Sequence, residues 1–200
     1  MWSYILTAIA GYLLGSIPTG FLVARARGID IRAAGSGNIG ATNAMRVLGK
    51  PVGIFVLLMD AFKGFAACWF LPPAIWNALA PHFSDQFTVF HKEPVEIQMR
   101  LYIAAGLFAV FGHNYTCWLK FKGGKGIATS AGVYLALAPL ALGIALLTFI
   151  VAVMGTRYAS VGSIAAAIAL PLAVYFTQTN DTLNIITLFL GAMAIYKHKS

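Results

Sequence analysis

Residues 127–154 read IATSAGVYLALAPLALGIALLTFIVAVM and contain no charged side chain. A helix needs about 20 consecutive apolar residues to cross the hydrocarbon core of a bilayer, so this stretch belongs in a membrane. It fits either one long tilted helix or two short helices that turn at Ala138 and Pro139. Because Arg157 and the polar residues after it are expected on the same side as the other basic loops, we predict the hairpin of two short helices.

Further apolar blocks flank this hairpin, and one of them follows a typical helix start, Glu93-Pro94. The blocks cover residues 2–24, 52–71, 95–118, 161–176 and 183–196. Together with the hairpin they predict an all-α integral membrane protein, a bundle of seven transmembrane helices, some of them short, in a single domain over residues 1–200. Residues 73–92 carry Pro, Asn, Ser and Asp, and we expect them to form a loop on the outer face.

The composition agrees with a membrane protein. Apolar residues make up 60% of the chain and charged residues 10%, whereas an ordinary soluble domain has about half and a quarter. These values exclude a soluble enzyme, a coiled coil, a disordered tail and a secreted disulfide scaffold as first interpretations. Cys68 and Cys117 lie in or at the end of apolar blocks, and no structural disulfide is implied.

The net charge of +8 follows from the orientation of the protein in the membrane. Arg25 and Arg27 follow the first apolar block, which places the N-terminus outside and the next loop in the cytoplasm. Most other basic residues then fall on the cytoplasmic side, together with the C-terminus. No basic stripe is interleaved with exposed aromatic residues, so we expect no nucleic-acid partner. Gly11 and Gly15 form a small-xxx-small pair, which predicts close packing of the first helix.

The first cytoplasmic loop, residues 31–46, reads IRAAGSGNIGATNAMR. Its glycines free the backbone to turn tightly, so that N–H groups can converge on an anion. Ser36, Asn38, Thr42 and Asn43 add neutral hydrogen-bonding groups, and Arg46 adds a planar fork suited to phosphate. The loop also matches the G-x-G-x-x-G dinucleotide fingerprint, but that fingerprint requires a strand before it, and here a membrane helix precedes the loop. A plain glycine-rich turn is the alternative.

The second cytoplasmic loop, residues 112–129, reads GHNYTCWLKFKGGKGIAT. Lys122 to Gly126 again combine flexible backbone with cations, and the next helix begins there with its positive end toward the same anion. This is not a Walker loop, because glycine follows Lys125. His113 and Asn114 fall near the inner end of a membrane helix, where an ionisable group suggests a purpose. His113 and Cys117 alone make no zinc site, so we predict no metal.

Polar residues elsewhere extend this pattern. Asp60 and Lys63 lie three apart on one face of the second block, either as a self-neutralising pair or as part of a binding site. The third cytoplasmic segment, residues 157–164, contains Ser160, and the last one contains His198. The four segments predict an anion-binding floor against an apolar bundle, suited to a substrate with a phosphate head and a fatty tail.

Several of these stretches occur, in order, in one protein family. The matching residues are 35–43 (GSGNIGATN), 112–115 (GHNY), 121–129 (FKGGKGIAT) and 157–164 (RYASVGSI), with 15–18, 60–64 and 197–199 in support. The chain therefore resembles the bacterial acyl-phosphate:glycerol-3-phosphate acyltransferases, the PlsY family, over almost its whole length. It departs from the family pattern at Ile39, where Pro or a smaller residue is frequent, and at Thr116, where Pro is usual.

The resemblance implies an enzyme of the bacterial inner membrane with its active site on the cytoplasmic side. It would move an acyl chain from acyl phosphate to the first hydroxyl of glycerol 3-phosphate, giving lysophosphatidic acid and inorganic phosphate in the first step of phospholipid synthesis. The substrates and the lipid bilayer are the expected partners, no cofactor is implied, and we expect a monomer. The residues that it suggests for catalysis are His113, Asn114, Ser36 and Arg46. Those that it suggests for substrate and phosphate binding are Gly37, Asn38, Asn43, Lys63, Lys122, Gly123, Gly124, Lys125, Gly126, Thr129, Ser160 and His198.

Two questions stay open at this point. His113 is the obvious general base, but a phosphate oxygen of the bound substrate is the rival. The other class of function is a small transporter of phosphate compounds or a lipid flippase. Transporters usually show paired broken helices and internal repeats, whereas here the phosphate-suited residues cluster on one side and no repeat is visible. The enzyme is therefore the favoured interpretation.

Overall fold

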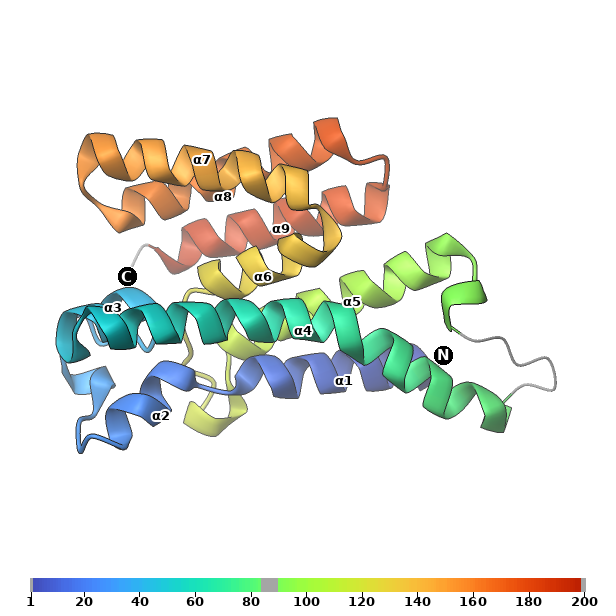
Figure 1. Ribbon diagram of the computed structural model, residues 1–200, viewed down its shortest axis with the longest axis horizontal. Helices are drawn as coiled ribbons and strands as arrows, with labels where there is room; N and C mark the ends of the chain where they lie inside the picture. Colours follow the sequence, from blue (N-terminus) through green and yellow to red (C-terminus); the bar gives the residue numbers. More distant parts are fainter. Residues whose placement is uncertain (1, 84–89, 199–200) are drawn as a thin grey trace. The chain divides into compact units, whose positions relative to one another are not determined.

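The computed structural model describes residues 2–83 and 90–198, and within these ranges the chain is helical, without a β-strand (Figure 1). The α-helices are α1 (Trp2–Ser16), α2 (Thr19–Arg25), α3 (Ala41–Leu48), α4 (Lys50–Phe83), α5 (Val95–Asn114), α6 (Ile127–Leu137), α7 (Pro139–Thr156), α8 (Ala159–Thr177) and α9 (Asp181–Lys197). Short 3₁₀ turns lie at η1 (Ile31–Ala33), η2 (Phe90–Lys92) and η3 (Cys117–Leu119). The chain forms two compact units, Met1–Val133 and Tyr134–Ser200.

Five helical stretches of the described residues are long and apolar enough to cross a membrane. They are Trp2–Arg25, Lys50–Leu79, Val95–Leu119, Pro139–Thr156 and Ala159–Thr177. The predicted division of residues 127–154 into two helices is confirmed, because α6 ends at Leu137 and α7 begins at Pro139. The start of α5 after Pro94 is confirmed as well. The number of spans and the orientation of the termini stay predictions.

The structure differs from the sequence prediction in two places. The first apolar block is not one helix, because α1 ends at Ser16 and α2 begins at Thr19. Pro18 has no N–H and cannot continue the hydrogen-bond ladder of α1. The predicted loop over residues 73–92 is helical as far as Phe83 and forms η2 at Phe90–Lys92, whereas its central part, residues 84–89, lies outside the described residues.

Long-range contacts hold this continuation of α4. The Trp76 ring packs 6.2 Å from the Phe90 ring, centroid to centroid, and the Phe90 N–H donates to Asn77 Oδ1 at 3.0 Å. Both residues of α4 come after Pro72 and Pro73, which the helix accommodates. Tertiary packing therefore overrides the local preference of the proline pair to end a helix.

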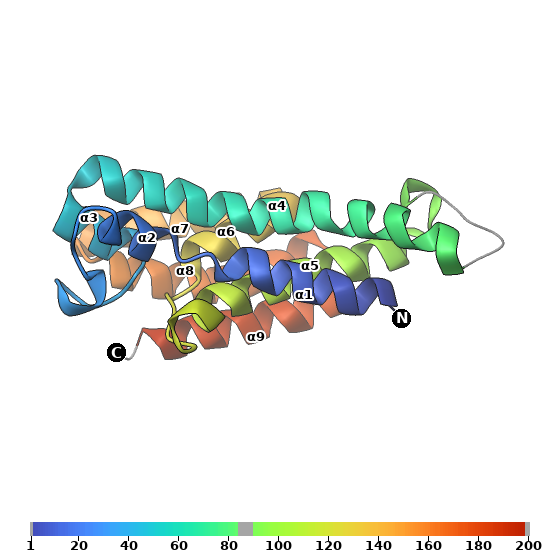
Figure 2. The same cartoon turned by 90° about the horizontal axis from the view of Figure 1, so that it is seen from below.

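In the first unit, α1, α4 and α5 pack against one another (Figure 2). Gly11 and Gly15 face the backbone of α5, and a Cβ at either position would overlap the carbonyl oxygen of Ala105 or Ala109. The expected packing role of this glycine pair is confirmed. This close approach brings the end of α1 next to the end of α5, where the polar residues described below lie.

In the second unit, α8 packs against both α7 and α9. Tyr134, the first residue of this unit, lies in α6 and donates a buried hydrogen bond of 2.6 Å to Thr187 Oγ1 of α9. Thr187 in turn donates to the Leu183 carbonyl oxygen at 2.6 Å. Close approach of the helices requires a small residue at Gly191, where a Cβ would lie 2.7 Å from the Ala167 carbonyl oxygen.

Candidate active site

The interruption of the first apolar block is the starting point of the site. Because Pro18 breaks the ladder, backbone carbonyls at the end of α1 are left for other donors. Thr116 Oγ1 donates to the Ser16 carbonyl oxygen at 2.6 Å, and Lys63 Nζ donates to the Ile17 carbonyl oxygen at 2.9 Å. Side chains that follow α5 or lie within α4 therefore satisfy the broken helix.

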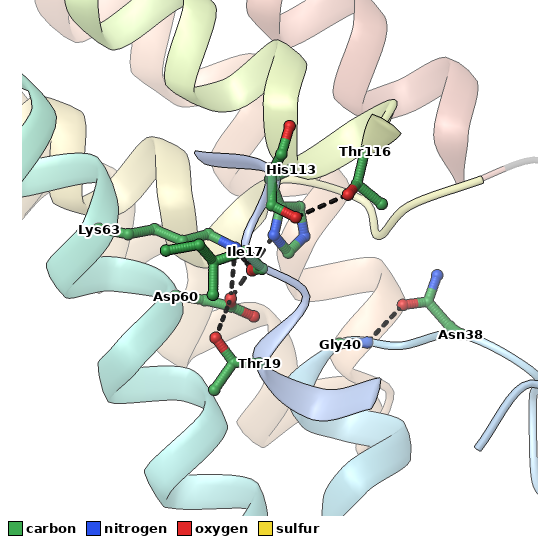
Figure 3. A network of polar contacts seen from close by, with 9 residues as sticks. Ile17, Thr19, Asn38, Gly40, Asp60, Lys63, His113 and Thr116 are labelled. Carbon is green, nitrogen blue, oxygen red and sulfur yellow. Dashed lines mark hydrogen bonds and ion pairs between the residues drawn. The ribbon is translucent and has the colours of Figure 1, made fainter. Parts of the chain in front are cut away.

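A buried polar cluster surrounds one carboxylate oxygen, Asp60 Oδ1 (Figure 3). Lys63 Nζ lies 2.8 Å from it, Thr19 Oγ1 donates to it at 3.4 Å, and His113 Nδ1 lies at 3.6 Å. Asp60, Lys63 and His113 are only 2%, 4% and 5% exposed. Groups from α2, α4 and α5 thus meet at a single atom in the interior of the first unit.

The first glycine loop is held from within by Asn43, which is buried in the first turn of α3. Its Nδ2 donates to the carbonyl oxygens of Ala34 and Asn38 at 3.0 and 2.9 Å. Its Oδ1 accepts the Ser36 N–H at 2.8 Å. The bends need glycine at position 37, since this residue has a φ of 71°. Asn43 therefore shapes the loop, and Ser36 is exposed on it.

The two arginines of this loop differ in their surroundings. Arg32 donates to both carboxylate oxygens of Asp30, at 3.0 and 2.8 Å, and these hydrogen bonds lower the pKa of Asp30 to about 2. Arg46 is exposed on α3, and it has no hydrogen bond or ion pair within the part of the chain that the structure describes. Arg46 is thus the arginine of the loop that is available to an anionic ligand.

The second glycine loop is bound to the end of α5. The Gly124 N–H donates to the His113 carbonyl oxygen at 3.0 Å, and the Gly123 N–H donates to the Asn114 carbonyl oxygen at 3.2 Å. A Cβ on Gly124 would overlap His113 Nε2, and one on Gly126 would lie 2.6 Å from Asn114 Oδ1. The buried His113 and Asn114 therefore lie directly under this loop.

Three further predicted residues belong to the same region. Lys122 is exposed, whereas Lys125 is partly buried, and this desolvation lowers the pKa of its ammonium group. Thr129 is fully buried in α6, and its hydroxyl has no hydrogen-bond partner among the described residues. Thr129 packs against Gly64 of α4, and a Cβ on Gly64 would overlap the Thr129 carbonyl oxygen.

The two glycine loops rest on a common hydrophobic cluster in the first unit. The cluster comprises Phe21, Ala24, Ile31, Ile39, Ala44, Val52, Val56 and Leu119. Ile31, Ile39 and Ala44 come from the first loop or α3, and Leu119 comes from the segment that leads to the second loop. The structure thus brings the two loops to the same end of this unit.

The second unit contains the remaining two predicted site residues. Ser160 is exposed at the start of α8. His198 follows α9, and its Nδ1 lies 2.7 Å from the Ala194 carbonyl oxygen. Their roles stay predictions. Among the described residues, no group of three or more His, Cys, Asp and Glu side chains is placed to hold a metal ion.

The sequence does not predict Thr19 or Thr116 as site residues. Thr116 stands where Pro is usual in the family, and in the structure its hydroxyl donates to the Ser16 carbonyl oxygen at the end of α1. The signal that could have found Thr116 is Pro18, since a proline inside an apolar block frees carbonyls that need donors. Thr19 donates to the Asp60 carboxylate, and no local signal in the sequence indicates that contact.

Residues 5–200 match the family described as glycerol-3-phosphate acyltransferase. This chain belongs to that family. A relative from Geobacter sulfurreducens, named glycerol-3-phosphate acyltransferase, is 47% identical over 98% of this chain and 89% of its own length.

Two solved structures of PlsY, an integral membrane glycerol 3-phosphate acyltransferase, have similar folds. The glycerol 3-phosphate form has a TM-score of 0.80 and 33% identity, and the lysophosphatidic acid form has a TM-score of 0.78 and 32% identity. Each match covers 98% of this chain and 88% of the solved one. The chain is therefore a membrane acyltransferase of the glycerol-3-phosphate acyltransferase family, as the motifs predict.

Proposed function

We propose that this protein transfers an acyl chain from acyl phosphate to the first hydroxyl of glycerol 3-phosphate, releasing lysophosphatidic acid and inorganic phosphate. The observation that carries the proposal is the convergence of two glycine-rich, cation-bearing loops on one hydrophobic cluster of the first unit. Arg46 and Lys122 are exposed there, as groups that bind phosphate need to be. The names of the solved relatives, in glycerol 3-phosphate and lysophosphatidic acid forms, agree with this substrate and product.

The chemistry is a direct transfer. Acyl phosphate is already activated, so the protein mainly has to align the hydroxyl with the carbonyl carbon and stabilise the charge that develops on the carbonyl oxygen. A bond forms between the glycerol oxygen and the carbonyl carbon, and the bond from that carbon to the phosphate oxygen breaks. The hydroxyl proton passes either to His113 or to a phosphate oxygen of the substrate. No covalent acyl-enzyme is needed.

Each predicted residue has a place in this scheme. The two loops hold the phosphate groups of the two substrates. The first loop contributes Ser36, Gly37, Asn38 and Arg46, and the second contributes Lys122 to Gly126. Asn43 shapes the first loop, and Asn114 supports the second. Thr129 of the first unit and Ser160 and His198 of the second unit are further residues that the family resemblance suggests for phosphate binding. The family resemblance suggests Lys63 for phosphate binding, but its ammonium group is buried and lies 2.8 Å from Asp60, which favours a supporting role.

The setting in the membrane belongs to the same proposal. We infer seven transmembrane helices, with α6 and α9 as short spans beside the five long ones. The N-terminus lies outside, and the catalytic loops face the cytoplasm of a bacterial inner membrane. In this proposal the protein is a monomer, and residues 1–200 form one acyltransferase domain. The reaction needs no metal or cofactor.

A phosphate-release assay on the purified protein in lipid tests the function. Palmitoyl phosphate is supplied with and without glycerol 3-phosphate, and lysophosphatidic acid is measured alongside phosphate. We expect release that depends on glycerol 3-phosphate and falls by about a hundredfold or more in Arg46→Ala. Arg27→Ala, which removes another exposed arginine of the same unit, is the matched control. Turnover that ignores the acceptor, or that survives in Arg46→Ala, would contradict the proposal.

A further inference from the structure

The ion pair between Asp60 and Lys63 lies next to Ile17, Thr19 and His113, and its printed contacts are with these residues (Figure 3). We propose that Asp60 and Lys63 are positioning residues, which fix the two substrate loops relative to each other through the Ile17 carbonyl and the His113 imidazole. The proposal rests on the proposed acyl transfer, because it assigns these residues to the geometry of that site.

The charges exist at this place only as a pair. Asp60 and Lys63 lie in a membrane-spanning helix and are almost completely buried. A single buried charge in such a helix is costly, and the partner offsets that cost. Replacement of a buried ion pair by apolar residues of similar volume is often neutral or stabilising, so the pair is weak evidence for a role in the stability of α4. Apolar residues could not make the polar contacts that the pair makes with Ile17, Thr19 and His113.

The first of these contacts controls the first loop. Lys63 Nζ holds the Ile17 carbonyl at 2.9 Å, and Thr19 Oγ1 donates to Asp60 at 3.4 Å. Both ends of the interruption between α1 and α2 are therefore tied to α4. The helix α2 then carries Gly20, which packs so closely on Ile39 that a Cβ would overlap its carbonyl oxygen. A shift of α2 would therefore displace the first glycine loop.

The second contact controls the second loop. His113 Nδ1 faces Asp60 at 3.6 Å, within ion-pair distance when the imidazole is protonated. The other ring nitrogen, Nε2, faces Gly124. The carbonyl oxygen of the same residue accepts the Gly124 N–H at 3.0 Å. A shift of the imidazole therefore moves the second loop.

One oxygen atom consequently relates two loops that lie far apart in the sequence. Asp60 Oδ1 contacts Lys63, Thr19 and His113, which come from three different helices. Uncharged side chains at positions 60 and 63 can fill the same space, but they do not fix the distances from position 60 to Thr19 and His113. Misplacement of substrate groups by about 1 Å costs up to roughly a hundredfold in rate.

A double neutralisation separates positioning from stability. The variant Asp60→Asn/Lys63→Met removes both charges and leaves no unpaired ion, so its thermal midpoint should lie within about 5 °C of the parent. We expect its KM for glycerol 3-phosphate to rise about tenfold and its kcat to fall about tenfold or more. Deuterium uptake should rise in residues 31–43 and 121–126. Loss of folded protein alone would lower the apparent kcat and leave KM unchanged.

The matched control is Glu96→Gln/Arg100→Met, which neutralises an exposed ion pair of α5. If the Asp60/Lys63 double variant has the KM, kcat and deuterium uptake of this control, the proposal is wrong. If the double variant does not fold, Thr19→Val decides, because it removes one contact to Asp60 and leaves both charges. Unchanged KM and unchanged uptake in Thr19→Val would overturn the proposal. If the parent shows no acyl transfer, the proposed function fails. Deuterium uptake in residues 31–43 and 121–126 then decides by itself whether Asp60 and Lys63 position the two loops.

Discussion

Gly124 lies against the imidazole of His113, so that a Cβ at position 124 would overlap Nε2. The substitution Gly124→Ala must therefore displace either the imidazole or the second loop. Both are predicted to contact substrate, and we expect kcat/KM to fall by about a hundredfold. The measurement is acyl transfer from palmitoyl phosphate at several glycerol 3-phosphate concentrations.

Gly143→Ala is the control for this substitution. Gly143 lies in α7, and among the described residues no atom beyond its chain neighbours and its own helix backbone is within 4 Å of the position that its Cβ would occupy. Activity in this variant should equal that of the parent. A Gly124→Ala variant as active as Gly143→Ala would show that the contact between the loop and His113 is not needed for catalysis.

The choice between the two general bases is open to a pH experiment. If His113 accepts the hydroxyl proton, His113→Gln should lower kcat by a factor of about 10² to 10⁴ and abolish the fall in rate on the acid side. If a substrate phosphate oxygen accepts it, kcat should fall less than about tenfold and the pH profile should keep its shape. We measure kcat from pH 5 to pH 9, with circular dichroism as the check on folding.

A second glycine prediction concerns stability. Gly15→Ala would place a Cβ into the Ala109 carbonyl group, between α1 and α5. Overpacking of this kind costs about 1–3 kcal/mol, and a lower thermal midpoint should report it. Labelling of the buried Cys68 by a thiol dye provides the signal for unfolding. The Cβ of Gly155→Ala in α7 meets no atom of the other described segments within 4 Å, so this variant should leave the midpoint unchanged.

The sequence predicts those parts of the fold that depend on local pattern. Apolar blocks locate α5, α8 and α9, and Pro139 correctly divides residues 127–154 into two helices. The continuation of α4 beyond Pro73 could not be predicted, because it depends on contacts between Trp76, Asn77 and Phe90. No local signal shows which distant side chain will pack there.

The same distinction applies to the site. Glycines and cations locate the two loops, since their backbone and charge requirements are visible in a short stretch of residues. The function of Asn43 as a support could not be predicted, because it depends on which carbonyls the folded loop brings to its amide. The contact between Thr19 and Asp60 joins residues 41 positions apart, and only the packing of α2 on α4 creates it.

A last prediction concerns the alkaline limit of the reaction. Partial burial lowers the pKa of Lys125, so this lysine loses its positive charge at a lower pH than a lysine in water. If Lys125 binds a substrate phosphate, the KM for that substrate should rise as the pH increases through the lowered pKa. Lys125→Arg keeps a charge throughout, because a guanidinium is not deprotonated in this range, and should move the rise in KM to higher pH. The control is Lys120→Arg, an exposed lysine outside the predicted site, which should leave the profile unchanged. Identical KM profiles for the parent and Lys125→Arg would exclude a charged contact between Lys125 and the substrate.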